Sequence, residues 1–194
     1  MPKKAIVFLA EGFEEVEAVT PVDYLRRAGV DVTTAAVGAS RTVKGAHGME
    51  INADAAFAEL AKKGGADAGF WDAVILPGGG GGSKNLAASK ETGALVRAMA
   101  ASGKLVAAIC ASPAVVLAPL GVLKGRKFTC YPGMEKEVSG AVWSSDPVVA
   151  DGNIITSRGA GTAGAFALAV IGKLVSEAAG KKIAGQVVVP GETI

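Results

Sequence analysis

Two apolar runs constrain the fold of this chain more than any other feature of its sequence. The stretches WDAVILPGG (Trp71–Gly79) and KLVAAIC (Lys104–Cys110) lack the polar alternation of a strand that has one face in water. Between them, KETGALVRAMAASG has helical periodicity and reaches a stop at Gly103. Strands buried on both faces and separated by helices predict a mostly parallel sheet sandwiched between helices.

The N-terminal part of the chain predicts a further unit of the same kind. The runs KAIVFLA (Lys4–Ala10) and DVTTAAV (Asp31–Val37) are typical of strands. Between them, apolar residues at helical spacing precede a glycine that marks the end of a helix: Val16, Val19, Val22, Leu25 and Gly29. The sequence therefore predicts a strand, helix, strand unit.

The remaining segments complete a single domain. The stretch RTVKGAHGMEINADAAFAELAKK predicts a short hairpin and then a helix that begins near Asp54, at an edge of the sheet. The pair Asp151-Gly152 between two β-rich runs predicts a second hairpin. The apolar stretch GTAGAFALAVIGKLVSEAAG predicts one long closing helix. We expect residues 1–194 to form one doubly wound α/β domain.

Charge and cysteine content limit the partners and the cellular compartment that we expect for the protein. The 20 basic and 18 acidic residues are scattered and leave a formal net charge of +2, so we expect no nucleic-acid or membrane-surface partner. The first apolar run is too short for a signal peptide or a spanning helix. Cys110 and Cys130 are the only thiols. We therefore expect a cytoplasmic, reduced protein without disulfides.

The glycine run in LPGGGGGSKN does not fit a phosphate-binding motif. A Walker loop needs Lys and then Ser or Thr after its last glycine, whereas Ser83 precedes Lys84. A dinucleotide fingerprint that started at Gly78 would need its third glycine at position 83. The run then reads either as a flexible turn or as a strand-end loop whose N–H groups approach a substrate oxygen. We expect no bound cofactor and no metal.

The junction AAICASPAV places Cys110 between a buried strand and a helix. Ser112 is a favourable N-cap and Pro113 suits the first helical position, so the strand runs almost directly into the helix. Ala108 and Ser112 are small, as a nucleophile elbow requires of its neighbours. A helix N-terminus favours the thiolate and predicts a lowered pKa for Cys110. The alternative is a buried structural cysteine, and Cys130 in KFTCYPGM is interpreted in that way or as a secondary thiol.

These stretches together resemble the ThiJ/PfpI superfamily, and in particular its DJ-1-like branch. The resemblance extends over nearly the whole chain and rests on LAEGFEEVEAVTPVDYLRRAG, DAVILPGG, AAICASPAVVLA and TSRGAGTAGAFALA in the family's order and spacing. It implies a doubly wound, flavodoxin-like sandwich that forms a homodimer. The interface expected by similarity consists of the first helix and the hairpin around His47.

The resemblance also implies roles for particular residues. The family's reactive cysteine matches Cys110, and its protonated glutamate, which hydrogen-bonds the sulfur, matches Glu17. Such a glutamate needs a raised pKa, and the neighbouring Glu14 and Glu15 are either alternatives for this role or members of a solvated helix N-terminus. The family's oxyanion donors match Gly79 and Ala111.

Two arginines that approach the family's pocket match Arg27 and Arg158, although either one is also compatible with an ordinary surface charge. Tyr131 stands where many members carry a histidine, and we expect it to contact substrate. The sole histidine, His47, lies in the early hairpin. A cysteine protease or amidase is therefore disfavoured.

The function implied is a glutathione-independent glyoxalase III-like lyase or deglycase-type hydrolase. Cys110 would form a hemithioacetal with methylglyoxal or glyoxal, and Glu17 would act as acid and base on the way to lactate or glycolate. Repair of glycated thiols or amines would be the same chemistry on an adduct. The alternative is a redox-sensing stress-response protein or chaperone whose Cys110 is oxidised to sulfinate.

Overall fold

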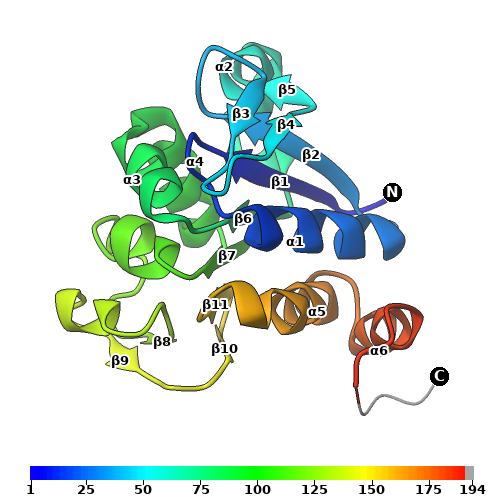
Figure 1. Ribbon diagram of the computed structural model, residues 1–194, viewed down its shortest axis with the longest axis vertical. Coiled ribbons are helices and arrows are strands. Elements are labelled where there is room, and N and C mark those ends of the chain that lie inside the picture. The colour runs from blue at the N-terminus through cyan, green and yellow to red at the C-terminus, as the bar shows by residue number, and fades with distance from the viewer. Residues whose placement is uncertain (191–194) are drawn as a thin grey trace.

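A seven-stranded sheet forms the centre of the computed structural model, which describes residues 1–190 (Figure 1). In spatial order the strands are β10, β11, β7, β6, β1, β2 and β5, and all neighbouring pairs are parallel except β10 with β11. Their bounds are β1 Lys4–Leu9, β2 Asp31–Ala36, β5 Ala55–Ala56, β6 Ala73–Leu76, β7 Leu105–Ile109, β10 Val148–Asp151 and β11 Ile154–Ser157. The predicted mostly parallel, doubly wound sheet is confirmed.

Helices cover both faces of this sheet. On one face, α1 and α5 lie side by side, with α6 packed on α5 (Figure 1); α4 and the first residues of α2 pack on the other, where Leu95, Met99 and Phe57 belong to its core. The bounds of the α-helices are α1 Glu15–Arg27, α2 Phe57–Leu60, α3 Gly80–Ala88, α4 Lys90–Ala101, α5 Ala163–Leu174 and α6 Glu177–Gln186. Among residues 1–190, no helix has the length and apolar character needed to cross a membrane.

Shorter elements complete the described chain. Two small ribbons stand outside the main sheet, the antiparallel pair β3 Thr42–Lys44 and β4 Glu50–Asn52 and the parallel pair β8 Lys127–Phe128 and β9 Val142–Trp143. Single helical turns follow other elements: η1 Ala61–Gly65, η2 Ala68–Phe70, η3 Pro113–Leu117, η4 Met134–Glu137 and η5 Ala160–Thr162. The β3–β4 hairpin confirms the one predicted near His47.

The order of the strands predicts where a ligand would bind on the sheet. The chain proceeds outward from β1 to β2 on one side and from β6 to β7 and β11 on the other, so β1 and β6 are neighbours at which the winding changes direction. Open α/β sheets bind ligands beyond the carboxyl ends of their strands at such a switch point. The segments that leave β1, β6 and β7 there contain Glu17, Gly79 and Cys110.

Several expected boundaries are wrong. The predicted closing helix is two helices, because Ser176 is extended (φ −173°) and its hydroxyl accepts a hydrogen bond from the N–H of Ala179 at the start of α6. The helix expected near Asp54 begins at Phe57, since Ala55 and Ala56 first pair with β2. The glycine run is mostly helical, because α3 starts at Gly80.

Helix α1 also differs from the expectation. Val16 is 48% exposed and Val19 is 46% exposed, while Leu25 is fully buried. The side chains that the first turns bury are instead Glu15, Glu17 and Ala18. The periodic valines therefore mark an outward apolar face of α1, and the buried face carries two carboxyl groups toward the switch point.

Candidate active site

Cys110 lies at a strained turn directly after β7. Its φ is +65°, in the left-handed region that costs a residue with a Cβ about 1 kcal/mol or more. Two backbone hydrogen bonds hold it there: its N–H donates to the Ser157 carbonyl (2.9 Å), and its carbonyl accepts from the N–H of Tyr131 (2.8 Å). The cysteine therefore occupies a nucleophile elbow, as its small neighbours predicted.

The helix after the elbow is anchored in an unexpected way. Pro113 occupies the first turn as predicted, but Ser112 is not its cap, because its backbone is already helical (φ −62°, ψ −33°) and its side chain caps nothing. The Ser112 hydroxyl instead donates to the Pro77 carbonyl at the end of β6. This bond ties the turn after β7 to the glycine segment after β6.

Glu17 faces the thiol from α1. Its side chain is fully buried, and its Oε2 accepts a 2.9 Å hydrogen bond from the N–H of Gly78. Oε1 is buried and has no hydrogen-bond partner among residues 1–190. The carboxyl group as a whole interacts with the Cys110 thiol, and each affects the pKa of the other. Desolvation by burial raises the pKa of Glu17 to about 7, although the N–H of Gly78 acts against this rise. The structure thus brings together the predicted cysteine and glutamate.

The pKa of the thiol itself differs from the prediction. Burial, followed by the charge of Glu17, raises the pKa of Cys110 to about 12, while the N–H groups of Gly79 and Ala111 lower it. The expected lowering at a helix N-terminus is wrong, because the sulfur has lost most of its water and lies beside a carboxylate. Since each group affects the ionisation of the other, Cys110 and Glu17 titrate as a pair.

Gly79 and Ala111, the expected oxyanion donors, direct their N–H groups at the sulfur. Gly79 has φ +87°, and a Cβ at this position would meet the Gly12 carbonyl oxygen, so only glycine fits the backbone here. Gly78 is restricted as well, because a Cβ there would lie 2.6 Å from both the Cys110 Cβ and the Glu17 Oε2. The close approach of three chain segments explains these two glycines.

A cavity of about 350 Å³ opens in front of the sulfur. Tyr131, which we expect to contact substrate, is 52% exposed and forms part of the wall of this cavity. Most of the other lining side chains were not predicted from the sequence, because they come from η3, η4 and α3, which are far from Glu17 along the chain. The full lining is Glu14, Gly79, Gly80, Ser83, Lys84, Cys110, Ala111, Val115, Tyr131 and Met134.

The two arginines expected near the pocket do not line it. Arg27 is ten residues after Glu17 in α1, about 15 Å along the helix axis, and forms an exposed ion pair with Asp23 (2.8 Å). The Arg158 guanidinium donates to the Ser145 carbonyl (2.9 Å). Within this chain neither expectation is met, because both guanidinium groups are engaged outside the cavity.

Cys130 is fully buried, in agreement with a structural thiol. Burial raises its pKa to about 11, and the charge of Glu135 acts in the same direction while that of Arg158 opposes it. The thiol donates to the Tyr131 carbonyl (3.5 Å). Both Cys110 and Cys130 are free thiols.

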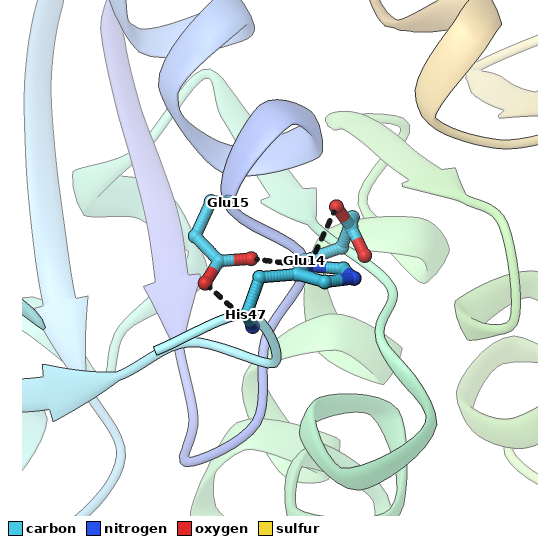
Figure 2. A group of neighbouring side chains, drawn as sticks. All are labelled: Glu14, Glu15 and His47. Carbon is cyan, nitrogen blue, oxygen red and sulfur yellow. Dashed lines mark hydrogen bonds and ion pairs between the residues drawn. The ribbon is translucent and has the colours of Figure 1, made fainter. Parts of the chain in front are cut away.

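A second polar group lies beside the cavity, where the β3–β4 hairpin meets the start of α1 (Figure 2). Glu15 is buried, and its carboxylate accepts from the N–H groups of His47 (2.8 Å) and Met49 (3.3 Å). The His47 Nδ1 lies 3.0 Å from the Glu15 carboxylate and 3.5 Å from that of Glu14. The three side chains place oxygen and nitrogen atoms within 4.8 Å of one another, as a metal site requires.

The hydrogen bonds give this group a structural role. Desolvation alone would raise the pKa of Glu15, but the bonds from its own N–H, His47 and Met49 outweigh it and the pKa is lowered. The alternative interpretation of Glu15 as part of a solvated helix N-terminus is therefore wrong. The chain's sole histidine binds this carboxylate, so it fixes the hairpin on α1 and is not the base of Cys110.

Together, the sheet, the strained cysteine after β7 and the buried carboxyl define the class of α/β proteins with a cysteine at a nucleophile elbow. Residues 3–173 match the model of the DJ-1/PfpI family, and the chain belongs to that family.

Similar proteins of known family agree with this assignment. Protein dj-1beta of Drosophila melanogaster is 43% identical over 94% of this chain and 92% of its own length. A deglycase of Thermococcus kodakarensis is 34% identical over 80% of this chain and 89% of its own length. The solved structure of oxidised DJ-1 from Toxoplasma gondii superposes with a TM-score of 0.91 at 34% identity, covering 97% of this chain and 99% of that chain.

Proposed function

We propose that the protein is a glutathione-independent glyoxalase or deglycase-type enzyme that acts on small 2-oxoaldehydes such as methylglyoxal and glyoxal. The observation that carries the proposal is the buried Glu17 carboxyl beside the Cys110 thiol, with a pKa raised to about 7. A group that titrates near neutral pH is suited to take up and release protons. Similarity to a deglycase supports the same class of chemistry.

The first step joins the sulfur to the aldehyde carbon. The Cys110 thiol proton passes to the Glu17 carboxylate as the C–S bond forms and the carbonyl electron pair moves to oxygen. The N–H groups of Gly79 and Ala111 stabilise the developing oxygen charge. Glu17 then delivers the proton to this oxygen, which gives a neutral hemithioacetal and restores the carboxylate.

The second step moves hydrogen between the two carbons. Glu17 removes the proton from C1, the electron pair forms an enediolate, and the same proton is returned to C2 while the C1 hydroxyl proton transfers to the C2 oxygen. The product is a 2-hydroxyacyl thioester. Water then adds to its carbonyl and the C–S bond breaks, so that a thiol and lactate or glycolate are released. The oxoaldehyde and one water supply every atom, and no external oxidant or reductant takes part.

A second candidate function is redox sensing in a stress-response or chaperone protein. Two peroxide molecules would convert the Cys110 thiol into a sulfinic acid and release two waters. The Gly79 and Ala111 N–H groups and the Glu17 carboxyl act on the sulfur and would bind the new oxygens. Similarity to a DJ-1 solved in an oxidised form favours this candidate.

We further propose that the protein acts as a homodimer in the cytoplasm, without nucleic-acid or membrane partners. The half-exposed Val16 and Val19 on α1 support a self-association surface, since adjacent exposed apolar side chains favour burial against a partner. Free, uncrosslinked Cys110 and Cys130 are consistent with a reducing compartment.

Turnover of methylglyoxal by the wild type, Cys110→Ser and Glu17→Gln tests the proposed enzyme. We expect the wild type to release lactate, with kcat/KM rising with pH through about 7 as Glu17 loses its proton. Both variants should lose at least about 100-fold in rate. If the wild type releases no lactate while peroxide adds two oxygens to Cys110, the enzyme proposal is overturned and the sensor proposal is supported.

A further inference from the structure

The Cys110 cavity is larger than a three-carbon dicarbonyl needs. Its volume is about 350 Å³, whereas a water molecule in the liquid occupies about 30 Å³. The cavity therefore has room for roughly ten groups of that size, about twice the number of carbon and oxygen atoms in methylglyoxal. Space remains beside the bound aldehyde, and the residues around it indicate what fills it.

Part of the cavity wall is apolar. Val115 in η3 and Met134 at the start of η4 are half-buried, and both line the cavity together with the Tyr131 ring. An aromatic group covered by these side chains would remove apolar surface from water, which favours binding. A thioether and a phenol ring also make favourable contacts with an aromatic ring.

Two charged residues, Glu14 and Lys84, also line the cavity. Glu14 lies 3.5 Å from the His47 ring, so its carboxylate is directed toward the β3–β4 hairpin (Figure 2). Lys84 is exposed on the second turn of α3. Val115, Tyr131 and Met134 form the uncharged part of the wall and offer an apolar surface to a substrate substituent.

We propose that Val115, Tyr131 and Met134 form a subsite for an aromatic substituent, and that the preferred substrates are 2-oxoaldehydes with an aryl group in place of methyl. This inference rests on the proposed function. The steps are those given for methylglyoxal: the aldehyde carbon bonds to Cys110, Glu17 transfers the proton from C1 to C2, and water releases the acid. Phenylglyoxal and one water thus give mandelate.

The test compares phenylglyoxal with methylglyoxal on the wild type, Val115→Ala, Met134→Ala and Met134→Leu. We expect wild-type kcat/KM to be about tenfold or more higher for phenylglyoxal. Each alanine variant should reduce that ratio several-fold, while Met134→Leu keeps most of it. Val142→Ala is a matched control, because Val142 is 62% exposed and does not line the cavity. Equal ratios in the wild type and the alanine variants would overturn the subsite.

A binding measurement separates this subsite from the enzyme proposal. Acetophenone has the aryl ketone but no aldehyde, so Cys110 does not convert it. We expect it to shift the NMR signal of the Met134 methyl group in a saturable way, and the shift to be lost in Val115→Trp, which fills the cavity. If acetophenone shifts this signal and no oxoaldehyde is turned over, the subsite stands and the enzyme proposal fails. If the signal does not move, the subsite is wrong even where methylglyoxal is converted.

Discussion

Glu17 and Gly78 are 61 residues apart in the chain, and the Gly78 N–H donates a 2.9 Å hydrogen bond to the Glu17 carboxyl. This bond joins α1 to the segment after β6 and fixes one carboxyl oxygen, while the other has no hydrogen-bond partner among residues 1–190. A buried carboxyl held by a single N–H keeps its proton more readily than one in water. The position of Glu17 in the fold therefore sets its ionisation.

The raised pKa of Glu17 makes the protein less stable at high pH. A carboxyl whose pKa rises from 4.5 to about 7 binds more protons in the folded state, so stability falls as the pH rises between these values. The full effect is about 3 kcal/mol. We expect Glu17→Gln, which is neutral at every pH, to have a free energy of unfolding about 2 kcal/mol higher than the wild type at pH 8.

Urea unfolding at pH 5 and pH 8 measures this effect. The difference between Glu17→Gln and the wild type should shrink at pH 5, where the wild-type carboxyl in the folded state is already protonated. Equal stability of the two proteins at pH 8 would show that Glu17 ionises without cost and would contradict its raised pKa.

The packing of Gly78 predicts a loss of activity without a loss of the fold. A Cβ at this position would push against Cys110 and Glu17, and displacement of reacting groups by about 1 Å can cost about 100-fold in rate. We expect Gly78→Ala to lose that factor in turnover of methylglyoxal. Gly172→Ala in α5 is the matched control, because no atom lies within 4 Å of the added Cβ. Full activity of Gly78→Ala would mean that the elbow tolerates a wider spacing.

The left-handed backbone of Cys110 predicts that glycine is more stable than alanine at this position, the reverse of their usual order in a strand. Glycine adopts a φ of +65° without the strain of a Cβ, so Cys110→Gly should be about 1 kcal/mol more stable than Cys110→Ala. At Ala108 in β7, the change to glycine should destabilise the protein instead. Thermal or urea unfolding of these variants checks both signs, and a less stable Cys110→Gly would argue against strain at the elbow.

The outward valines of α1 predict a charge-sensitive dimer. We expect Val19→Glu to convert a dimer into a monomer of 19.3 kDa in light scattering after gel filtration. Val142→Glu introduces the same charge at another exposed valine and should leave the mass unchanged. A dimeric Val19→Glu would place the interface on another surface.

His47 is predicted to titrate above its ordinary range. The hydrogen bond with Glu15, and next the charge of Glu14, raise the pKa of His47 above 6.5. The pairing thus stabilises the hairpin fully below pH 6.5, and its contribution is lost as the pH rises through the folded-state pKa. NMR titration of the His47 ring should show a pKa above 6.5 in the wild type. The same titration in Glu15→Gln should show a lower pKa. A wild-type pKa at or below 6.5 would contradict the ion pair.

Local sequence patterns predicted the sheet and the position of Cys110, because a strand buried on both faces and a strand-to-helix junction are visible in consecutive residues. Glu17 came from the family resemblance, since no local pattern shows which of Glu14, Glu15 and Glu17 faces the cysteine. The bond from Ser112 to Pro77 and the approach of Met134 to the cavity depend on residues far apart in sequence. The pKa of Cys110 was predicted in the wrong direction because desolvation depends on the complete fold.

The raised pKa of Cys110 means that folding makes this thiol a latent nucleophile. An unfolded cysteine ionises near pH 9, and the folded one near pH 12, so untargeted alkylating reagents should modify the native protein more slowly than the denatured chain. A substrate that occupies the cavity meets both a proton acceptor in Glu17 and two N–H donors at once. Under the proposed enzyme function, selectivity among electrophiles would come from the need to satisfy all of these groups together.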